Sequence, residues 1–347
     1  MIELQRAIII QTAFLGDVVL TLPLIQKLKQ EQPECAIDVV VIPRCAEILK
    51  NHPDVHEIIL YDKRKQESGI SGLLNKAKEF RAKKYDWAFV PHRSVRSAAL
   101  ARLANIPHRV GFSNSSGRWM FTDVVLYKQE QHEVVRNLQL LKSLGIQTEE
   151  KILPQLYPSQ YDIQTVELFL KEYSLTGERI VAIAPGTVWN TKCWLTERFA
   201  DLSSNIIEKG FHVVLIGGKE DEALAHEIVN TVDSKRISSS VGKLTILQSA
   251  ELIRKCSVLV TNDSAPMHLA VAMRTPVVAI FGATVPEFGF APIGEMDVVL
   301  GAKGLSCRPC SIHGGRECPI KTFDCMKSIC VEMVQSEVAR LIERTNT

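Results

Sequence analysis

The chain lacks long apolar runs and a strong charge of either sign. No stretch of its 347 residues approaches the length of a membrane-spanning helix, which needs about 20 apolar residues. The N-terminus has no basic segment followed by a long apolar one, so we expect no secretory signal and a cytoplasmic protein with at most a peripheral membrane contact. The formal net charge is only +2, so no global basic field indicates a nucleic-acid partner.

Low-complexity tracts and short repeats are also absent. No Gly-x-Gly-x-x-Gly follows the first predicted strand, which argues against a Rossmann dehydrogenase. The composition, 46% hydrophobic and 23% charged, is that of a soluble globular enzyme. At 347 residues the chain is too long for one ordinary core, so we expect two domains.

Hydrophobic patterning predicts alternating strands and helices in both halves, and repeated βα units favour a parallel sheet in each. In the first half we expect strands near 7–11, 37–42, 57–60, 86–90 and 123–127, and helices near 17–31, 44–51, 70–83, 94–104 and 133–144. In the second half we expect strands near 180–184, 212–216, 257–261 and 277–281, and helices near 163–173, 196–209, 220–232, 245–254, 266–273 and 331–344. The fold class is therefore α/β.

The segment from Gly145 to Asp162, with Pro154 and Pro158, is typical of a connection between domains. We expect an N-terminal domain at residues 1–162 and a C-terminal domain at residues 163–347. The second domain includes a Cys-rich loop at 307–330 and a terminal helix. Two similar α/β halves predict a cleft between them.

The most informative segment runs from Val260 to Ala270. An apolar strand stops there at a polar turn, and a helical pattern follows. Asp263 or Ser264 is a good N-cap, and Pro266 suits the first turn. The N–H groups and the positive dipole end of such a helix can bind an anion, with His268 close by. A capped helix without a ligand would give the same pattern.

Three other predicted strand ends carry glycine, hydroxyl or charged residues. Gly16-Asp17 follows the first strand, and Pro185-Gly186-Thr187 follows the strand near 180–184, with Lys192 just beyond. Gly217-Gly218 closes the next strand and precedes Lys219-Glu220-Asp221-Glu222. Open parallel sheets bind ligands at the carboxyl ends of their strands, so these segments are candidate site residues.

Taken together, these motifs resemble glycosyltransferase family nine, the ADP-heptose:lipopolysaccharide heptosyltransferases of GT-B fold. The resemblance covers about residues 7 to 290, with the motifs in family order. It implies two Rossmann-like domains and inverting transfer of a heptose from ADP-heptose to the inner core of lipopolysaccharide, at the cytoplasmic face of the inner membrane. The motifs are Gly16-Asp17-Val18, Pro185-Gly186-Thr187 with Lys192-x-Trp194, Gly217-Gly218 with the acids that follow, Thr261-Asn262-Asp263-Ser264-Ala265-x-x-His268 and Phe281-Gly282-Ala283-Thr284.

Glycosyl transfer needs a base for the acceptor hydroxyl and a group that stabilises the departing diphosphate. The resemblance implies that Asp17 is the catalytic base, although an Asp at this position could equally cap the Val18 helix. It implies that Lys192 reaches the donor phosphates, whereas a lone lysine is more often a solvated surface residue.

The resemblance implies a larger donor-binding set. Thr187 and the N–H groups around Ser264 and Ala265 would add phosphate donors, and Ala265 replaces the commoner glycine of the family motif. Asp221 aligns best with the acid that holds the ribose, and Glu220 and Glu222 remain alternatives. The full expected donor set is Gly16, Gly186, Thr187, Lys192, Asp221, Asp263, Ser264, Ala265 and His268. Positive charge from Lys192 and a helix end could replace a divalent metal, so we expect catalysis without a metal cofactor.

The acceptor side is marked by basic residues that phosphate and carboxylate groups of a lipopolysaccharide core would attract. We expect acceptor contacts from Arg93 and Arg96, which follow the fourth strand, and from Arg118. Lys63-Arg64-Lys65 is a further basic run in a loop. Each could also be part of a solvated face.

Cys307, Cys310, Cys318, Cys325 and Cys330 gather in one segment that begins Cys-x-x-Cys. A cytoplasmic location argues against disulfides and leaves free thiols or a metal. Four thiolates could close a structural zinc or iron site at Cys307, Cys310, Cys318 and Cys325. The later spacing fits no standard finger, so free thiols under a loop remain the alternative. A metal here would hold the loop and take no part in the chemistry.

Other functions remain open at this point. They are another GT-B enzyme, either a heptosyltransferase acting on protein or a sugar-nucleotide epimerase, and a non-catalytic nucleotide-sugar binding module. Asp17 argues against the module, because binding a donor needs no base in the opposite domain. An epimerase would release free nucleotide without any acceptor. The sequence leaves open the heptose position, the exact acceptor and the oligomeric state.

Overall fold

The computed structural model describes residues 4–148 and 151–345 and divides into two compact units, Met1–Tyr157 and Pro158–Thr347. The division lies five residues before the expected boundary at 162, because residues 160–162 form the first turn of helix α6 (Gln160–Glu172). Ser159 and Asp162 form a reciprocal capping box at the start of that helix. The expected connection at 145–162 includes two residues, 149 and 150, that lie outside the described ranges.

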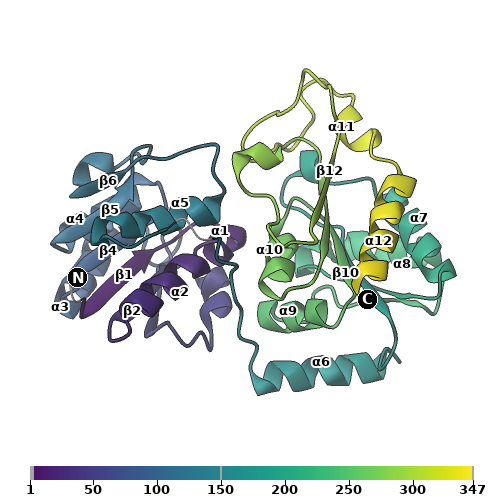
Figure 1. Ribbon diagram of the computed structural model, residues 1–347, viewed down its shortest axis with the longest axis horizontal. Coiled ribbons are helices and arrows are strands. Elements are labelled where there is room, and N and C mark those ends of the chain that lie inside the picture. Colours follow the sequence, from purple (N-terminus) through teal and green to yellow (C-terminus); the bar gives the residue numbers. More distant parts are fainter. Residues whose placement is uncertain (1–3, 149–150, 346–347) are drawn as a thin grey trace. The chain divides into compact units, whose positions relative to one another are not determined.

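The first unit contains a six-stranded sheet, all parallel, in the order β3-β2-β1-β4-β5-β6 (Figure 1). This is the doubly wound order. Successive strands are added toward one edge of the sheet up to β3, and from β4 onward they are added toward the other edge, so the switch point lies between β1 and β4. The strands are β1 (Arg6–Ile10), β2 (Ala36–Val41), β3 (Glu57–Leu60), β4 (Trp87–Val90), β5 (His108–Phe112) and β6 (Asp123–Val125).

The second unit repeats this topology with the order β12-β11-β10-β7-β8-β9. Its six strands are also parallel, and the reversal falls between β7 and β10. The strands are β7 (Ile180–Ala184), β8 (His212–Leu215), β9 (Ile237–Ser239), β10 (Val258–Asn262), β11 (Val277–Phe281) and β12 (Val298–Gly301). The expected fold class, α/β with two parallel sheets, is confirmed.

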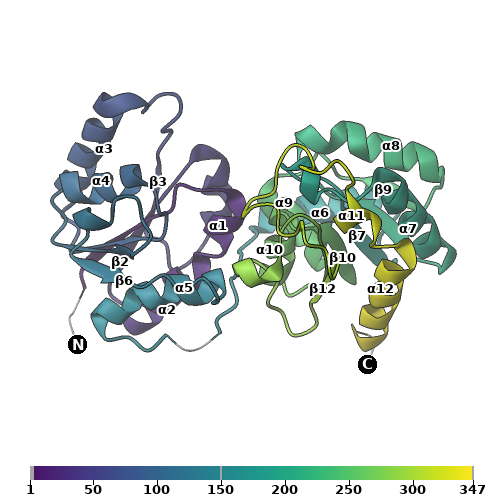
Figure 2. The same ribbon diagram turned by 90° about the horizontal axis from the view of Figure 1, so that it is seen from above.

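Helices cover both faces of each sheet, as the turned view also shows (Figure 2). In the first unit α3 packs on α4, and α2 packs on α5. In the second unit α7 packs between α8 and α12, while α9 packs against α6 and α10. The helices of the first unit are α1 (Leu15–Val19), α2 (Leu22–Glu31), α3 (Gly69–Lys83), α4 (Val95–Leu103) and α5 (Glu133–Gln139), with 3-10 turns η1 (Pro43–Leu49), η2 (Arg118–Met120) and η3 (Leu140–Leu144). Those of the second are α6, α7 (Thr196–Glu208), α8 (Glu222–Val232), α9 (Ile246–Arg254), α10 (Ala265–Ala272), α11 (Asp324–Lys327) and α12 (Val331–Thr345), with η4 (Asn190–Lys192), η5 (Lys219–Asp221) and η6 (Pro286–Phe288).

The central strands are almost completely buried, which is why they appear in the sequence as continuous apolar runs. Phe80 and Phe89 are among the largest fully buried side chains of the first unit, and Trp194, Phe199 and Phe281 of the second. Among the described residues, no helix is long and apolar enough to cross a membrane.

The expected helix at 17–31 is wrong as a single element. It is broken into α1 and α2, and Pro23, which has no N–H, lies in the first turn of α2. The Thr21 hydroxyl lies at the break, donating to the Asp17 carbonyl at 2.8 Å and accepting from Gln11 Nε2 at 3.0 Å. The break leaves Asp17 on a short helix at the carboxyl end of the sheet.

Candidate functional site

Each sheet carries a group of polar side chains where its strand order reverses. In doubly wound sheets this is the point at which loops diverge and ligands bind. In the second unit the loops after β7 and β10 meet there. In the first unit the loops after β1 and β4 meet.

In the second unit Lys192 and Asp263 form a close ion pair. Lys192 Nζ lies 2.6 Å from Asp263 Oδ2, and both side chains are almost buried. The Thr284 hydroxyl, in the segment that follows β11, donates to the same carboxylate oxygen at 2.6 Å. Asp263 therefore fixes the lysine instead of capping α10. The expected alternative for Lys192, a solvated surface residue, is wrong.

Asn262 connects the two loops and was not expected as a site residue. Its Nδ2 donates to the Pro185 carbonyl at 2.7 Å, and its Oδ1 accepts from the backbone N–H of Trp194 at 3.0 Å. The amide thus holds both ends of the segment that carries Gly186, Thr187 and Lys192. The signal in the sequence was a polar residue at the last position of a buried strand.

Helix α10 begins at the same place, with Ser264 as its N-cap residue. The Ser264 hydroxyl makes no capping bond to the backbone and lies 3.2 Å from the Thr261 hydroxyl. The helix start, at Ala265, is therefore not closed by its own N-cap side chain. His268 lies one turn into α10 and is buried. The positive end of the helix and the Lys192 ammonium belong to one group.

The acids after β8 can be told apart by the glycines beside them. A Cβ added to Gly186 would lie 2.0 Å from Asp221 Oδ1, and one added to Gly217 would lie 2.6 Å from its Oδ2. The carboxyl groups of Glu220 and Glu222 instead adjoin Gly218 and Gly242, respectively. Asp221 is therefore the acid that lies against the loop after β7. Burial, partly offset by the Gly218 N–H bond, raises the pKa of its carboxyl above the usual range.

In the first unit the loops after β1 and β4 are joined by hydroxyl and imidazole groups. His92 Nδ1 lies 2.9 Å from the Thr12 hydroxyl and 2.8 Å from the Ser97 hydroxyl. Lys63 Nζ donates to the Thr12 carbonyl at 2.7 Å. Burial, and then the charges of Lys63 and Arg93, lower the pKa of His92 to about 4, so this histidine is neutral at pH 7.

Asp17 is the third residue of α1, whose N-cap residue is Phe14, and its side chain forms the N3 part of a capping box at the start of that helix. Its Oδ2 accepts the Phe14 backbone N–H at 3.1 Å. Burial of the carboxyl group and the nearby Glu133 charge raise the pKa of Asp17 to about 6, partly offset by the Phe14 N–H and by Arg93. A carboxylate with this pKa can hold and release a proton near neutral pH. Gly16 precedes it in α1, in a different unit from the other expected donor residues.

The three expected acceptor arginines have different surroundings. The Arg93 guanidinium lies 4.7 Å from the centre of the Tyr127 ring, and its charge acts on Asp17. Arg96 is used within the fold, since it donates to the Tyr61 hydroxyl and to the Glu67 carbonyl. Arg118 is exposed on η2. Of these three arginines, Arg93 is the one whose charge lowers the pKa of Asp17.

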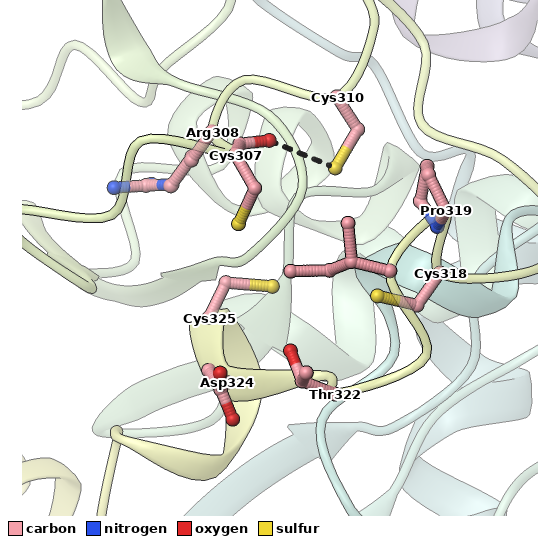
Figure 3. A pocket seen from close by; sticks show the side chains of 9 residues that line it. Cys307, Arg308, Cys310, Cys318, Pro319, Thr322, Asp324 and Cys325 are labelled. Atoms are coloured by element: carbon pink, nitrogen blue, oxygen red, sulfur yellow. Dashed lines mark hydrogen bonds between the residues drawn. The ribbon is translucent and has the colours of Figure 1, made fainter.

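The Cys-rich loop lies in the second unit, between β12 and α12. Its cysteines Cys307, Cys310, Cys318 and Cys325 line one small cavity, and their side chains surround it (Figure 3). The fifth, Cys330, is not among the residues that line it. None of the nine cysteines of the chain forms a disulfide.

The chain resembles known proteins over most of its length. A model of glycosyltransferase family 9 (heptosyltransferase) matches residues 74–321. Lipopolysaccharide heptosyltransferase 2 of Salmonella typhimurium is 29% identical over 82% of this chain and 84% of its own length. Lipopolysaccharide heptosyltransferase 3 of Escherichia coli is 30% identical over 78% of this chain and 82% of its own.

Solved structures share the fold. A glycosyltransferase family 9 protein from Veillonella parvula superposes with a TM-score of 0.90 at 24% identity, covering 99% of both chains. The E. coli ADP-heptose lipopolysaccharide heptosyltransferase II superposes with a TM-score of 0.80 at 23% identity, covering 99% of this chain and all of that one. The two-sheet architecture described above is the one that these proteins adopt.

Proposed function

This chain belongs to glycosyltransferase family 9, the heptosyltransferases, and on that basis we propose that it transfers a heptose from ADP-heptose to the inner core of lipopolysaccharide, with inversion at the anomeric carbon. Its curated relatives are lipopolysaccharide heptosyltransferases over more than three quarters of the chain. The observation that carries the assignment to a site is the Lys192–Asp263 pair at the start of α10.

The second unit would hold the donor. The Lys192 ammonium, which lies against Asp263 just before α10, and the positive end of α10 would together stabilise the charge that develops on the departing diphosphate. Thr187 and the N–H groups of Ser264 and Ala265 would add hydrogen bonds to the phosphates. Asp221, held against Gly186, would accept hydrogen bonds from the ribose hydroxyls.

The first unit would supply the base. The acceptor hydroxyl oxygen forms a bond to the anomeric carbon of the heptose while its proton passes to the Asp17 carboxylate. The bond from the anomeric carbon to the phosphate oxygen breaks, and its electron pair leaves with ADP. The raised pKa of Asp17 suits it to this proton transfer.

Fixed positive groups make a divalent metal unnecessary in this scheme. Lys192 and the α10 dipole neutralise the leaving diphosphate in place of a bound cation. We therefore propose that catalysis needs no metal cofactor. Turnover that rises with added magnesium or manganese would contradict this part of the scheme.

Acceptor binding and membrane contact belong to the first unit in this proposal. Arg93 would meet phosphate or carboxylate groups of the core. A bilayer surface would meet Ile70 and Leu74, which are 76% and 50% exposed on α3, a few residues after the exposed cations Arg64 and Lys65. Apolar side chains beside cations suit an anionic membrane surface.

Vesicle sedimentation tests the membrane contact. The variant with Ile70→Ser and Leu74→Ser should bind vesicles of phosphatidylethanolamine and phosphatidylglycerol more weakly than the parent protein. Leu168→Ser is the matched control, since Leu168 is 68% exposed on α6 in the other unit. Equal vesicle binding by all three proteins would remove the proposed surface.

We place the reaction at the cytoplasmic face of the inner membrane, as the family resemblance implies. Nine cysteines without a disulfide are consistent with a reducing compartment. Fractionation of cells that express the chain would test this placement, with the protein expected in the cytoplasmic and peripheral-membrane fractions.

The experiment that tests the function combines purified protein, ADP-heptose and truncated lipopolysaccharide acceptors. We expect ADP release that requires an acceptor and a product heavier by one heptose. Nucleotide release without any acceptor would instead favour an epimerase. Donor binding without any transfer would favour a binding module.

A further inference from the structure

We propose that Cys307, Cys310, Cys318 and Cys325 bind one structural metal ion, zinc or iron, and that this ion holds the Cys-rich loop against Thr191 so that Lys192 stays in position. The metal site goes beyond the proposed glycosyl transfer. The effect on Lys192 rests on that proposed function.

The first observation is the convergence of four thiols from distant parts of the loop. Cys307 and Cys310 follow β12, Cys318 lies further along, and Cys325 lies in α11. Their side chains line a cavity of about 20 Å³ (Figure 3), and one small ion or water needs roughly 10–15 Å³. Four thiolates are the ligand set of structural zinc and of single iron sites.

The sulfur atoms surround the cavity without being in contact. In the described part of the chain, no three of these Sγ atoms lie within 4.8 Å of one another. A tetrahedral ion with metal–sulfur bonds of about 2.3 Å needs sulfur atoms about 3.8 Å apart, so binding would draw the side chains inward. Ile320, which also lines the cavity and is half-exposed, has solvent to rotate into.

The second observation is a cation that anchors the loop without entering the cavity. Arg308 lies between the first two cysteines, and its guanidinium points away from the sulfur atoms (Figure 3). It donates to the carbonyls of Gly282, Phe281 and Thr284 at 2.6–2.9 Å, and also to that of Ala302. The beginning of the loop is thereby tied to the end of β11, beside the site, and its positive charge partly offsets that of the thiolates.

The third observation is that the middle of the loop holds the segment that ends in Lys192. The Gly315 N–H donates to the Thr191 hydroxyl at 2.7 Å, and the Thr191 N–H donates to the Gly315 carbonyl at 3.1 Å. A Cβ on Gly314 would lie 2.9 Å from Lys192 Cγ, so only glycine admits the lysine stem there. Gly314 and Gly315 lie between Cys310 and Cys318. An ion that joins these two cysteines therefore fixes both ends of the segment that contacts Thr191 and Lys192, which we call the clamp.

Metal analysis tests the site directly. Protein purified without chelators should contain about one equivalent of zinc or iron, and Cys318→Ser should contain less than about a tenth of one. Cys310→Ser is a second ligand variant in case the first misfolds. Cys330→Ser is the matched control and should keep its metal, because Cys330 is not among the residues that line the cavity. Cobalt substitution should give the intense thiolate-to-metal absorption of a tetrahedral site in the parent and in Cys330→Ser only.

A double-mutant cycle tests the effect on Lys192. We expect Cys318→Ser to weaken ADP binding about tenfold or more, since a misplacement of about 1 Å can reduce the activity of a site up to about 100-fold. In a Lys192→Ala background the same change should have almost no further effect, because the two residues act through one contact. If the loop acted on ADP binding independently of Lys192, Cys318→Ser would reduce ADP affinity by the same factor in both backgrounds.

The outcomes separate the two parts of the inference. Less than about a tenth of an equivalent of metal in the parent, or metal lost equally from Cys330→Ser, overturns the site. Additive effects of Cys318→Ser and Lys192→Ala on the free energy of ADP binding overturn the proposed effect of the loop on Lys192. A failure of acceptor-dependent transfer overturns the proposed function instead, since metal content, the cobalt spectrum and ADP affinity do not depend on turnover.

Discussion

At the scale of single residues, Asp17 combines two properties that a catalytic base needs. It lies half-buried on a short helix at the switch point of the first sheet, and desolvation and the nearby Glu133 charge raise the pKa of its carboxyl group to about 6. The hydrogen bond that it accepts from the Phe14 N–H can be kept by an amide oxygen. The residue can therefore be altered chemically with little change in structure.

Asp17→Asn should keep the fold and ADP affinity and should lose turnover by roughly 10²–10⁴, the usual contribution of a general base. The asparagine oxygen still accepts the Phe14 N–H, so the start of α1 is preserved. Melting temperature, ADP affinity and turnover should be measured on one preparation. Near-normal turnover would leave Asp17 without a catalytic role.

The raised pKa of Asp17 predicts the pH dependence of both activity and stability. The base works when deprotonated, so kcat/KM should rise with pH through about 6. A carboxyl whose folded pKa lies above its unfolded value contributes stability at low pH, which is lost as pH rises through about 6. The rise of kcat/KM through about pH 6 should therefore be absent in Asp17→Asn. The melting temperature of this variant should be higher than that of the parent at about pH 8, but not below about pH 4. A parent profile that is flat across pH 6 would argue against this base.

Lys192→Ala should weaken donor use, because one charge-assisted phosphate contact is worth about 1.5–3 kcal/mol, or roughly 10- to 150-fold in affinity. It also leaves the buried Asp263 without its cation. Isothermal titration with ADP and steady-state kinetics would measure both effects, and Lys219→Ala on η5 is a suitable control. ADP binding and turnover that are both unchanged would remove Lys192 from the donor site.

At the scale of elements, the sequence showed where the buried strands end more clearly than it showed the complete set of strands. The buried strands β1, β4, β7, β10 and β11 stand out as continuous apolar runs. Strands β5, β9 and β12 were not predicted. β5 begins with His108-Arg109 and contains Gly111, and β9 has only three residues, two of them serine. β12 follows an irregular segment and is only partly buried.

The site shows the same division between local and non-local information. The segments after β7 and β10 could be found in the sequence because polar residues end apolar runs. The ion pair between these segments could not be predicted, since Lys192 and Asp263 are far apart in the sequence. The choice of Asp221 over Glu220 and Glu222 required the positions of Gly186 and Gly217. Gly314 and Gly315, inside the Cys-rich loop, gave no signal of their contact with Thr191.

The loop after β7 depends on the absence of a side chain at Gly186. Gly186→Ala places a methyl group 2.0 Å from Asp221 Oδ1, so the loop or the carboxylate must move. We expect weaker ADP binding, with a smaller loss when Asp221→Ala removes the obstructing carboxylate. Calorimetry on the two single variants and the double variant would measure this. A loss that is the same in both backgrounds would show that Gly186 acts by another route.

At the scale of the whole molecule, one doubly wound topology is used twice for different chemistry. The first unit carries the Asp17 carboxylate, which we propose as the base, together with cations, and the second carries a lysine and a helix end suited to a diphosphate. Both groups lie where the strand order reverses, so the topology accounts for their positions within each sheet. The division of roles predicts that ADP alone engages one unit.

Hydrogen exchange with and without ADP would test this division. Protection should increase in the loop after β7, around Asp221 and at the start of α10, all in the second unit. The segments around Asp17 and His92 should exchange unchanged with ADP alone. Protection confined to the first unit would reverse the assignment of donor and acceptor sides.

The most direct test of the central claim is acceptor-dependent ADP release from ADP-heptose, compared between the parent protein and Asp17→Asn. The account predicts release only when a lipopolysaccharide core acceptor is present, and a fall of roughly 10²–10⁴ in Asp17→Asn with ADP affinity retained. ADP release that ignores the acceptor, or that persists in Asp17→Asn, would contradict it.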